Sequence, residues 1–235
     1  MTLKNPQFWQ IHPVLSKNVT VEHVSTDPST ARSQTDACDP ESSDHVVIRN
    51  NKLGAHDDNV AIKSGRDADG RRVNVPTQNV VIYGGHMNGN WGAVTMGSEM
   101  TGGIRNVYAY KFTVGAATKF ALYVKSNTQR GGFAENVNLD SISGAFERSF
   151  AYVTMLYNSQ TGSNPPSFGP FRITSSGSTS APVVFDVNGL SNDHVKGLNV
   201  QNCSFNGVGS ATNKISNVDN LVFTNVKING NVVTR

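Results

Sequence analysis

The chain has 235 residues, a formal net charge of +3 and a pI of about 8.9, and charged residues make up only 16% of it. No run of Lys and Arg forms a polybasic arm, so nucleic-acid binding is not expected. No apolar stretch of about eighteen residues is present, which argues against a membrane span. Residues 1–10 also lack the apolar core and the cleavage site of a signal peptide. The composition therefore fits one globular domain without a nucleic-acid or membrane partner.

Short apolar runs with a similar opening recur along the chain. Most begin with Asn or His, continue with Val, Ile or Leu for about the length of a strand, and end near Asn, Gly or Ser. The separations between them lie mostly in the range of one solenoid coil. The runs occupy residues 18–21, 45–48, 59–62, 79–82, 106–109, 136–139, 194–195 and 220–223.

A strand that recurs in this way buries its apolar face only by stacking on its neighbours, so the sequence predicts an all-β solenoid, a parallel β-helix. Stacked coils place equivalent Val and Ile residues about 4.8 Å apart in columns, and Asn residues are expected to form ladders at the turns. An antiparallel β-sandwich is the alternative, but it would normally show hairpin turns between neighbouring strands. Residues 158–189 fit the repeat less well and are predicted to be a loop interruption within a single domain, 1–235. Cys38 and Cys203 are expected to be two buried thiols.

Three aspartates carry the strongest chemical signal. Asp36 lies in the string QTDACDP, and the adjacent pair Asp57 and Asp58 follows about one coil later. The three carboxylates should therefore lie beside one another on one face of the solenoid. Hydrolysis of a sugar chain needs such a group: a protonated acid for the leaving oxygen and carboxylates that activate water. Crowded carboxylates also raise the pKa of one member, which leaves a proton available near neutral pH.

Several long strings surround these aspartates: FWQIHPV, TDACDPESS, DDNVAIKSGRDADGRRVNVP, GAVTMGSEMTGGIRNV and VKSNTQRGG. Through them the chain resembles glycoside hydrolase family 28, the polygalacturonases, and most closely their exo-acting branch. The resemblance implies a right-handed parallel β-helix that cleaves α-1,4-galacturonosyl bonds of pectin with inversion and without a cofactor. By position, it makes Asp57 the acid and assigns the water to Asp36 and Asp58.

The resemblance also implies a secreted or periplasmic protein whose partner is a pectic polysaccharide or an oligogalacturonide. Family members carry further coils and a cap before FWQIHPV, so we expect the chain to lack the N-terminal coils that are usual in the family. We further expect a monomer.

Several positions beside the aspartates depart from the family pattern. Gln34 replaces Asn, and His56 stands where the family has Gly or Gln. Trp91 replaces a supporting histidine, and Tyr123 replaces an arginine that helps to hold the substrate carboxylate. Lys125 retains the lysine of the same motif, and as a point charge it is expected to contact that carboxylate. Trp91 and Tyr123 either stack on a sugar ring or fill the space that the polar residues left.

Arg66 opens an Arg-rich loop, residues 66–76, which either lines the cleft and attracts a polyanion or is simply solvated. We include Arg66, Gln34, His56, Trp91, Tyr123 and Lys125 among the predicted substrate-binding residues. No cluster of His, Cys and acids has metal-ligand spacing, so no metal is predicted. The leading interpretation is a polygalacturonase-like hydrolase. The alternatives are a catalytically degenerate β-helix that binds pectic oligosaccharide or is structural, and a hydrolase of a different pectic sugar.

Overall fold

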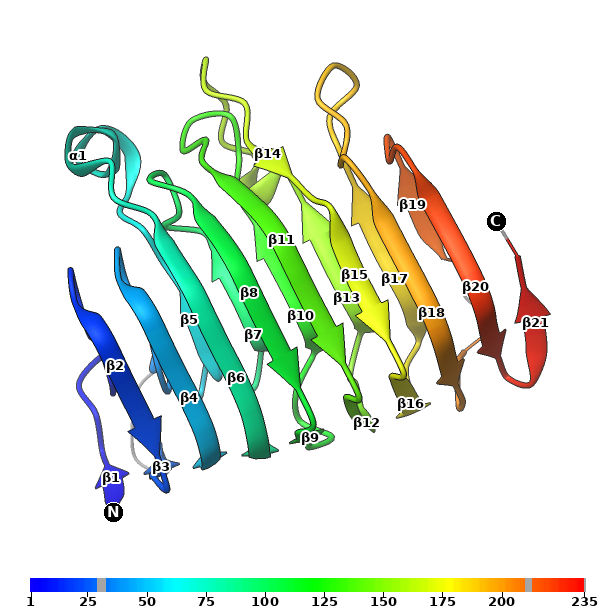
Figure 1. Ribbon diagram of the computed structural model, residues 1–235, viewed down its shortest axis with the longest axis horizontal. Helices are drawn as coiled ribbons and strands as arrows, with labels where there is room; N and C mark the ends of the chain where they lie inside the picture. The colour runs from blue at the N-terminus through cyan, green and yellow to red at the C-terminus, as the bar shows by residue number, and fades with distance from the viewer. Residues whose placement is uncertain (29–32, 210–212, 235) are drawn as a thin grey trace.

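The computed structural model describes residues 1–28, 33–209 and 213–234, and in it the chain winds into a stack of β-coils (Figure 1). The described residues form one fifteen-stranded sheet and one six-stranded sheet. Their named strands pair in parallel, with β20 and β21 as the antiparallel exception. This arrangement is the predicted parallel solenoid.

The long strands of the larger sheet lie side by side across the front of Figure 1. They are β2 (Lys17–Glu22), β4 (Asp44–Leu53), β6 (Thr77–Met87), β8 (Ile104–Tyr110), β11 (Phe133–Asp140), β15 (Phe171–Thr174), β18 (Leu198–Phe205) and β20 (Leu221–Ile228). Shorter strands of the same sheet are β1 (Thr2–Lys4), β3 (Ser25–Asp27), β9 (Thr113–Val114), β12 (Ser143–Ala145), β14 (Ser167–Phe168), β16 (Gly177–Ser180) and β21 (Asn231–Val233).

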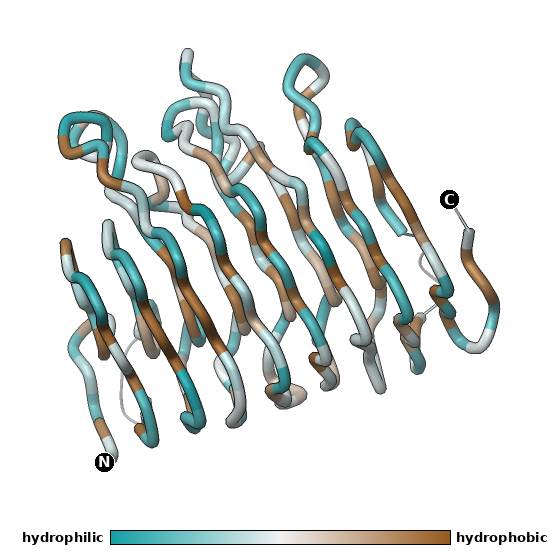
Figure 2. The backbone as a smooth tube through the Cα atoms, in the orientation of Figure 1, coloured by the Kyte–Doolittle hydropathy of each residue, from teal (hydrophilic) through white to brown (hydrophobic). Residues whose placement is uncertain are grey.

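The smaller sheet lies behind the larger one and carries the candidate site. Its strands are β5 (Val60–Ile62), β7 (Gly92–Gly97), β10 (Phe120–Lys125), β13 (Ser149–Thr154), β17 (Val183–Asn188) and β19 (Lys214–Ser216). The apolar core lies between the two sheets, and hydrophobic positions alternate with hydrophilic ones along the strands of the larger sheet (Figure 2).

Equivalent apolar residues stack in register, as the repeat predicts. One buried column of the larger sheet consists of Val46, Val80, Val107, Val137, Phe171 and Leu198. Each strand thereby covers the apolar face of the strand before it, which removes that surface from water.

The bend between the long and the short strands is made by residues in the left-handed conformation. They form a column in register: Asn50, Gly84, Lys111, Ser141, Ser175, Asn202 and Asn225. The predicted Asn ladder is also present. Asn106 Nδ2 donates to Asn79 Oδ1 over 3.0 Å, and Asn136 Nδ2 donates to Asn106 Oδ1 over 2.9 Å.

The prediction of a loop interruption over 158–189 is wrong from Ser167 onward, because β14, β15, β16 and β17 continue the solenoid there. The buried apolar contacts come from Phe168, Phe171, Ile173, Val184, Phe185 and Val187. Ser, Gly and Thr fill residues 174–180 between them, which interrupts the apolar repeat in the sequence. Of the predicted runs, residues 59–62 contain β5, which belongs to the smaller sheet. Residues 194–195 lie outside the named strands, and Val195 forms only an isolated bridge with Val218 before β18.

The loop expected at residues 66–76 contains a short helix, α1 (Asp67–Val73), which lies at the top left of Figure 1. Asp67 begins the helix and Arg72 lies in its last turn, where each charge complements the helix dipole. Seven residues are too few for an apolar helical repeat, so the sequence did not indicate it. A 3₁₀ turn, η1, occupies Tyr157–Ser159. Neither helix of the described chain is long and apolar enough to cross a membrane.

Candidate active site

The stacking register brings the three aspartates together. Cys38 pairs with Val60 in an isolated parallel bridge, so Asp36 lies directly beside Asp58 on the neighbouring coil. The backbone N–H of Asp58 donates to Asp36 Oδ1 over 3.0 Å. One carboxylate oxygen from each of Asp36, Asp57 and Asp58 lies within 4.8 Å of the others. The spacing of one coil therefore produces the predicted cluster.

The carboxylate of Asp58 is held from two sides. Its Oδ1 accepts a 2.7 Å hydrogen bond from the backbone N–H of Gly92, at the start of β7. Its Oδ2 lies 2.9 Å from Lys125 Nζ, at the end of β10. Asp58 is 1% exposed and Lys125 is 7% exposed, so this ion pair is shielded from water. Burial by itself would lower the pKa of Lys125, but the charge of Asp58 raises it above its usual range, which keeps the ammonium group protonated.

Asp36 is held by a second buried cation, Lys63, at the end of β5. Lys63 Nζ lies 3.3 Å from Asp36 Oδ2, 3.4 Å from Asp39 Oδ2 and 3.3 Å from Glu99 Oε2. Burial by itself would lower the pKa of this ammonium group, but the three surrounding carboxylates raise it above its usual range. Lys63 therefore joins acidic side chains from the two coils on either side of its own, Asp36 and Asp39 on one and Glu99 on the other.

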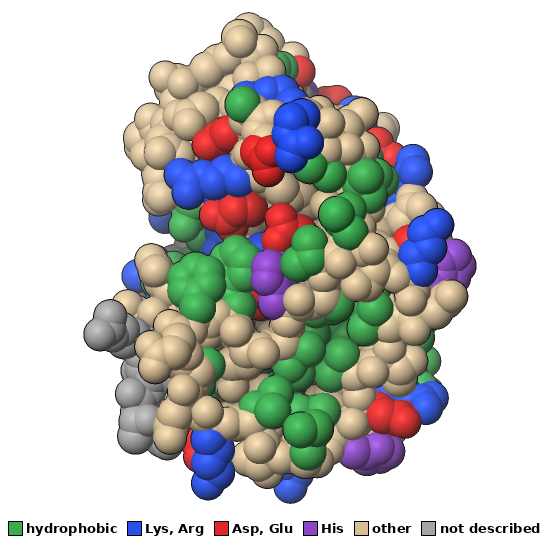
Figure 3. All heavy atoms as spheres, turned by 90° about the vertical axis from the view of Figure 1, so that its left-hand side faces the viewer, with side chains coloured by type: hydrophobic (Ala, Val, Ile, Leu, Met, Phe, Trp, Pro, Cys, Tyr) green, Lys and Arg blue, Asp and Glu red, His purple; other side chains and the backbone are tan. Residues whose placement is uncertain are grey.

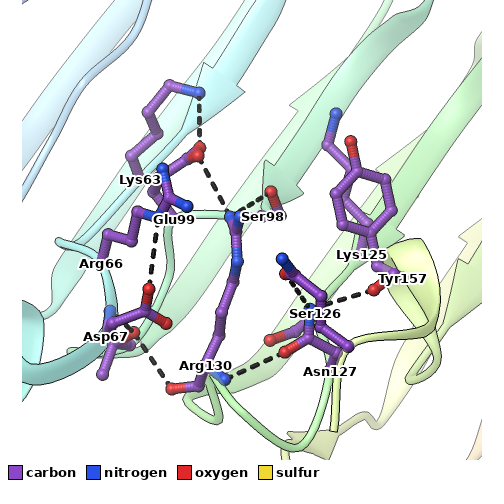
Figure 4. Close-up of polar contacts among 12 residues, drawn as sticks. Lys63, Arg66, Asp67, Ser98, Glu99, Lys125, Ser126, Asn127, Arg130 and Tyr157 are labelled. Carbon is purple, nitrogen blue, oxygen red and sulfur yellow. Dashed lines mark hydrogen bonds and ion pairs between the residues drawn. The ribbon is translucent and has the colours of Figure 1, made fainter.

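Figure 4 shows how Glu99 lies between Lys63 and Arg130. Arg130 Nη1 donates to Glu99 Oε1 over 3.1 Å and also to Ser98 Oγ. Burial would raise the pKa of Glu99, but the two cations together lower it to about 2. Glu99 is therefore ionised at any working pH. On the right of the same view, the Lys125 side chain lies next to the ring of Tyr157, 5.5 Å from its centroid.

Asp57 differs from its two neighbours because its side chain is only half-buried and borders the cleft. Burial, followed by the charges of Asp58 and Asp36, raises the pKa of Asp57 to about 7. Burial and the charge of Asp58 also raise the pKa of Asp36 above its usual range. The site thus holds one carboxyl group that carries a proton near neutral pH beside two deeper carboxylates that each contact a lysine.

Two adjoining hollows meet at Asp57. We call the first, about 230 Å³, the polar hollow; it is lined by Phe8, Trp9, Gln34, Asp36, Asp57, Asp58, Lys63, Arg66, Ser98, Glu99, Lys125 and Tyr157. We call the second, about 470 Å³, the aromatic hollow; it is lined by Ser33, Gln34, Asp57, Trp91, Tyr123, Lys125, Arg148, Tyr152, Leu156, Tyr157 and Asn158. Another hollow of about 370 Å³ lies on the larger sheet, but no carboxylate lines it.

Comparison with known proteins decides the family. The sequence model of glycosyl hydrolases family 28 matches residues 1–147 of the chain. The chain belongs to this family. It is 31% identical over 138 residues to a probable polygalacturonase from Vitis vinifera, a match that covers 58% of the chain and 28% of that protein. It is 28% identical over 144 residues to a polygalacturonase from Ralstonia solanacearum, which covers 60% of the chain and 25% of that protein.

Solved structures of polygalacturonases agree along nearly the whole chain. The hyperthermoactive exopolygalacturonase from Thermotoga maritima matches with a TM-score of 0.92 and 29% identity, over 98% of this chain and 51% of that one. The polygalacturonase from Erwinia carotovora ssp. carotovora matches with a TM-score of 0.73 and 26% identity, over 94% of this chain and 55% of that one. The right-handed parallel β-helix is thereby confirmed. The chain spans about a quarter of these curated relatives and about half of these solved structures.

Five of the six predicted substrate-binding residues line the two hollows: Gln34, Arg66, Trp91, Tyr123 and Lys125. His56 is half-buried and is absent from the lining of both, and its backbone N–H donates to Thr35 Oγ1 over 3.3 Å. Tyr123 is only 3% exposed, and its ring stacks against Trp91 with 6.3 Å between centroids. The structure therefore favours the space-filling interpretation for Tyr123.

Of the Arg-rich loop, Arg66 lines the polar hollow, and its Nε lies 3.2 Å from Asp67 Oδ2. Arg72 pairs with Asp69 on the exposed side of α1, while Arg71 Nη1 donates to the backbone oxygens of residues 129 and 130. Only one of the three arginines thus borders either hollow.

The sequence-based reasoning missed four polar residues around the aspartates: Asp39, Lys63, Glu99 and Arg130. A lysine directly after the apolar run 59–62 was a usable signal, because a cation next to a buried strand needs acidic partners. The aspartate cluster itself offers oxygen ligands of the kind that Mg²⁺ and Ca²⁺ prefer. Two of its three carboxylates, however, already contact an ammonium group. That no metal is used stays a prediction.

Proposed function

We propose that the chain carries the hydrolytic centre of a polygalacturonase-like enzyme, which cleaves α-1,4-galacturonosyl linkages of pectin with inversion. One observation carries the proposal: Asp57, whose pKa is raised to about 7, borders the cleft beside two buried carboxylates that contact lysines. A general acid works best when its pKa lies near the working pH. Asp57 meets this condition, and Asp36 and Asp58 are placed beside it to act on water.

In the proposed reaction, Asp57 transfers its proton to the glycosidic oxygen as the bond from that oxygen to the anomeric carbon breaks. Asp36 and Asp58 accept hydrogen bonds from a water molecule, whose oxygen forms the new bond to the same carbon. One of the two carboxylates takes the proton that the water loses, and Asp57 is left ionised until it is reprotonated from solvent. Lys63 and Lys125 support this division of roles because each contacts one of the two deep carboxylates.

The three carboxylates lie closer together than the acid and base of most inverting glycosidases. Acid and base groups of inverting glycosidases are usually about 6.5–9.5 Å apart, and those of retaining enzymes about 5–5.5 Å apart. Here the nearest oxygens of the three groups lie within 4.8 Å. Both oxygens of Asp58 are already engaged, by Gly92 and Lys125, and the two of Asp36 by Asp58 and Lys63. Carboxylates held in this way suit the orientation of water better than direct attack on the sugar.

The polar hollow supports an anionic substrate. Arg66 is exposed at its edge, and Lys125 lies at its junction with the aromatic hollow. Cations in such a cleft attract a polyanion and raise its local concentration. A pectic polysaccharide or an oligogalacturonide fits this lining, and hydrolysis by three carboxyl groups requires no cofactor. Such a substrate also fits a protein that acts in the periplasm or after secretion.

The proposal is tested by reducing-sugar release from polygalacturonate by the purified chain. Asp57→Asn should lower the rate at least about 100-fold, because a positioned general acid typically contributes 10²–10⁴-fold. Asp69→Asn is the matched control, since Asp69 lies on the exposed side of α1 in a pair with Arg72. Its rate should equal that of the unmodified chain.

Two results would contradict the proposal: no release from a chain shown to be folded, or release that survives Asp57→Asn. If the folded chain releases no sugar, the replacement of the family's histidine and arginine by Trp91 and Tyr123 would account for the lost turnover. Binding of oligogalacturonate without turnover would then identify a binding module. The absence of both binding and turnover would leave a structural protein or a hydrolase of a different pectic sugar.

A further inference from the structure

The polar and aromatic hollows form one cleft across the proposed acid. Four residues line both of them: Gln34, Asp57, Lys125 and Tyr157. A substrate whose glycosidic oxygen lies at Asp57 therefore places one sugar on each side, in surroundings of different chemistry. The specificity of the cleft depends on how each hollow binds the carboxylate of its own sugar.

Cations near the polar hollow are largely engaged with protein carboxylates. Lys63 contacts three acidic side chains, Lys125 contacts Asp58, and Arg66 contacts Asp67. Their positive charge is therefore shared between these protein carboxylates and the attraction of an anionic chain into the cleft.

The aromatic hollow has a wall of parallel rings. Trp91 and Tyr123 stack with an interplanar angle of 15°, and Tyr123 and Tyr152 stack at 12° with 5.4 Å between centroids. Because the faces of Tyr123 are turned toward its neighbours, the ladder offers a sugar mainly ring edges. Leu156, which is 56% exposed, adds a further apolar surface. This wall supplies apolar contact, but it has no means of its own to recognise a carboxylate.

Two cations approach the ring of Trp91, and only one of them lines the aromatic hollow. Lys119 Nζ lies 4.3 Å from the ring centroid, but it also donates to Asn90 O over 3.0 Å and lies 3.7 Å from Glu147 Oε2. The guanidinium of Arg148 lies 5.8 Å from the same ring and borders the hollow. Arg148 is exposed, and among residues 1–28, 33–209 and 213–234 its side chain forms no ion pair with a carboxylate.

We propose that Arg148 binds the carboxylate of the sugar in the aromatic hollow and so selects free galacturonate over its methyl ester at that position. The inference rests on the proposed function for the presence of a galacturonosyl chain. A guanidinium matches a carboxylate with two parallel hydrogen bonds, which is a stronger and more directional contact than a lysine provides. The backbone of Arg148 is held by hydrogen bonds to both neighbouring coils, to Lys119 O and from Val183 N–H, each over 3.2 Å. The backbone of Arg148 is thus fixed beside the ring ladder, and its guanidinium reaches the ring of Trp91.

The test compares kcat/KM for unesterified and for methyl-esterified oligogalacturonides of equal length. Arg148→Gln should lower the value for the unesterified substrate roughly 10- to 100-fold, the usual range for a lost hydrogen bond to a charged group. The loss on the methyl ester should be much smaller, because the ester offers no charge to Arg148. Arg148→Lys should restore part of the discrimination. Lys119→Gln is the matched control: it removes a cation beside the same ring and should leave the ratio of the two values unchanged.

A ratio that Arg148→Gln leaves unchanged, or that Lys119→Gln lowers equally, would overturn the inference while hydrolysis itself stands. The role of Arg148 can also hold while the proposed hydrolysis fails. Calorimetric binding of trigalacturonate and its methyl ester to chains that carry Asp57→Asn tests that role without turnover. If the unmodified chain proves inactive, selective loss of trigalacturonate binding in the Arg148→Gln variant would support the role of Arg148 without the proposed hydrolysis. Equal binding of the two ligands before and after that change would refute it.

Discussion

Replacement of Lys63 by methionine tests whether a buried cation holds the deep carboxylates in place. Lys63 is 3% exposed, and its ammonium lies 3.3 Å from the nearest oxygens of both Asp36 and Glu99. Coulomb's law over that distance gives about 1 kcal/mol in water and about 5 kcal/mol at an effective dielectric constant of about 20. Removal of one partner from a buried ion pair typically costs about 3–5 kcal/mol. We therefore expect Lys63→Met to lower the free energy of unfolding at pH 7 by about 3–5 kcal/mol.

The pH dependence of this loss follows from the shifted pKa values. The pKa of Glu99 is lowered from 4.5 to about 2, so its stabilising contribution is present above pH 4.5 and is lost as the pH falls toward 2. The pKa values of Asp36 and Asp39 are raised, so their ionisation opposes folding above pH 3.8. Without Lys63 all three pKa values rise further, and protonation then relieves the uncompensated charge. The difference between variant and unmodified chain should therefore be largest at neutral pH and shrink toward pH 4.

Urea unfolding followed by circular dichroism at pH 7 and at about pH 4.5 measures this difference. Lys4→Met is the control, because Lys4 pairs over 3.9 Å with Asp27, both side chains are at least 40% exposed, and such pairs contribute roughly 0–1 kcal/mol. The reasoning fails if Lys63→Met costs less than about 1 kcal/mol at pH 7, the level of a surface pair. It fails equally if the loss is the same at both pH values.

Four further predictions concern the chemistry of the site. The value of kcat/KM should fall as the pH rises through about 7, because Asp57 must carry a proton in the free enzyme; a flat profile up to pH 9 would exclude it as the acid. Asp39→Asn should keep activity within a few-fold, because burial raises the pKa of Asp39 well above its usual range and a neutral side chain suffices there. Asp58→Asn should lower the activity at least about 100-fold. Nuclear magnetic resonance of the first product should show inversion at the anomeric carbon; retention would make Asp36 or Asp58 a nucleophile. Dialysis against EDTA should leave the rate unchanged, and recovery of a lost rate by added divalent cation would disprove metal-free hydrolysis.

The parts of the fold that were predictable from the sequence are those whose signal repeats locally. Val, Ile and Asn recur at the same place in successive coils, and they form the core columns and the ladder from Asn79 to Asn136. In residues 167–189 this signal is interrupted, because Ser, Gly and Thr fill positions 174–180 between the apolar strands. Their strands are stabilised by contacts with coils about 27–35 residues away, such as the hydrogen bond that the backbone N–H of Ile142 donates to Ser176 Oγ.

The candidate site was likewise predictable from the sequence only in part. Asp36 and Asp58 were predicted to be neighbours because their separation is about one coil, and the bridge at Cys38 confirms that spacing. The roles of Lys63 and Lys125 follow from stacking over more than one coil. Lys125 pairs with Asp58 across a separation of 67 residues, and Lys63 with Glu99 across 36. A repeat pattern does not reveal which outward side chains meet over such separations.

The stacking of the coils also explains why the crowding of carboxylates persists. Asp36 and Asp58 occupy equivalent positions on adjacent coils, so their separation is set mainly by the strand spacing of about 4.8 Å and less by rotamer choice. Two like charges at this distance repel each other by about 3.5 kcal/mol at an effective dielectric constant of about 20. Lys63, directly after β5, and Lys125, at the end of β10, occupy one register position and supply the opposing charge. Within the part of the chain that the structure describes, Asp57 forms no ion pair with a cation, so its burial, together with the repulsion from Asp58 and Asp36 that the backbone maintains, raises its pKa.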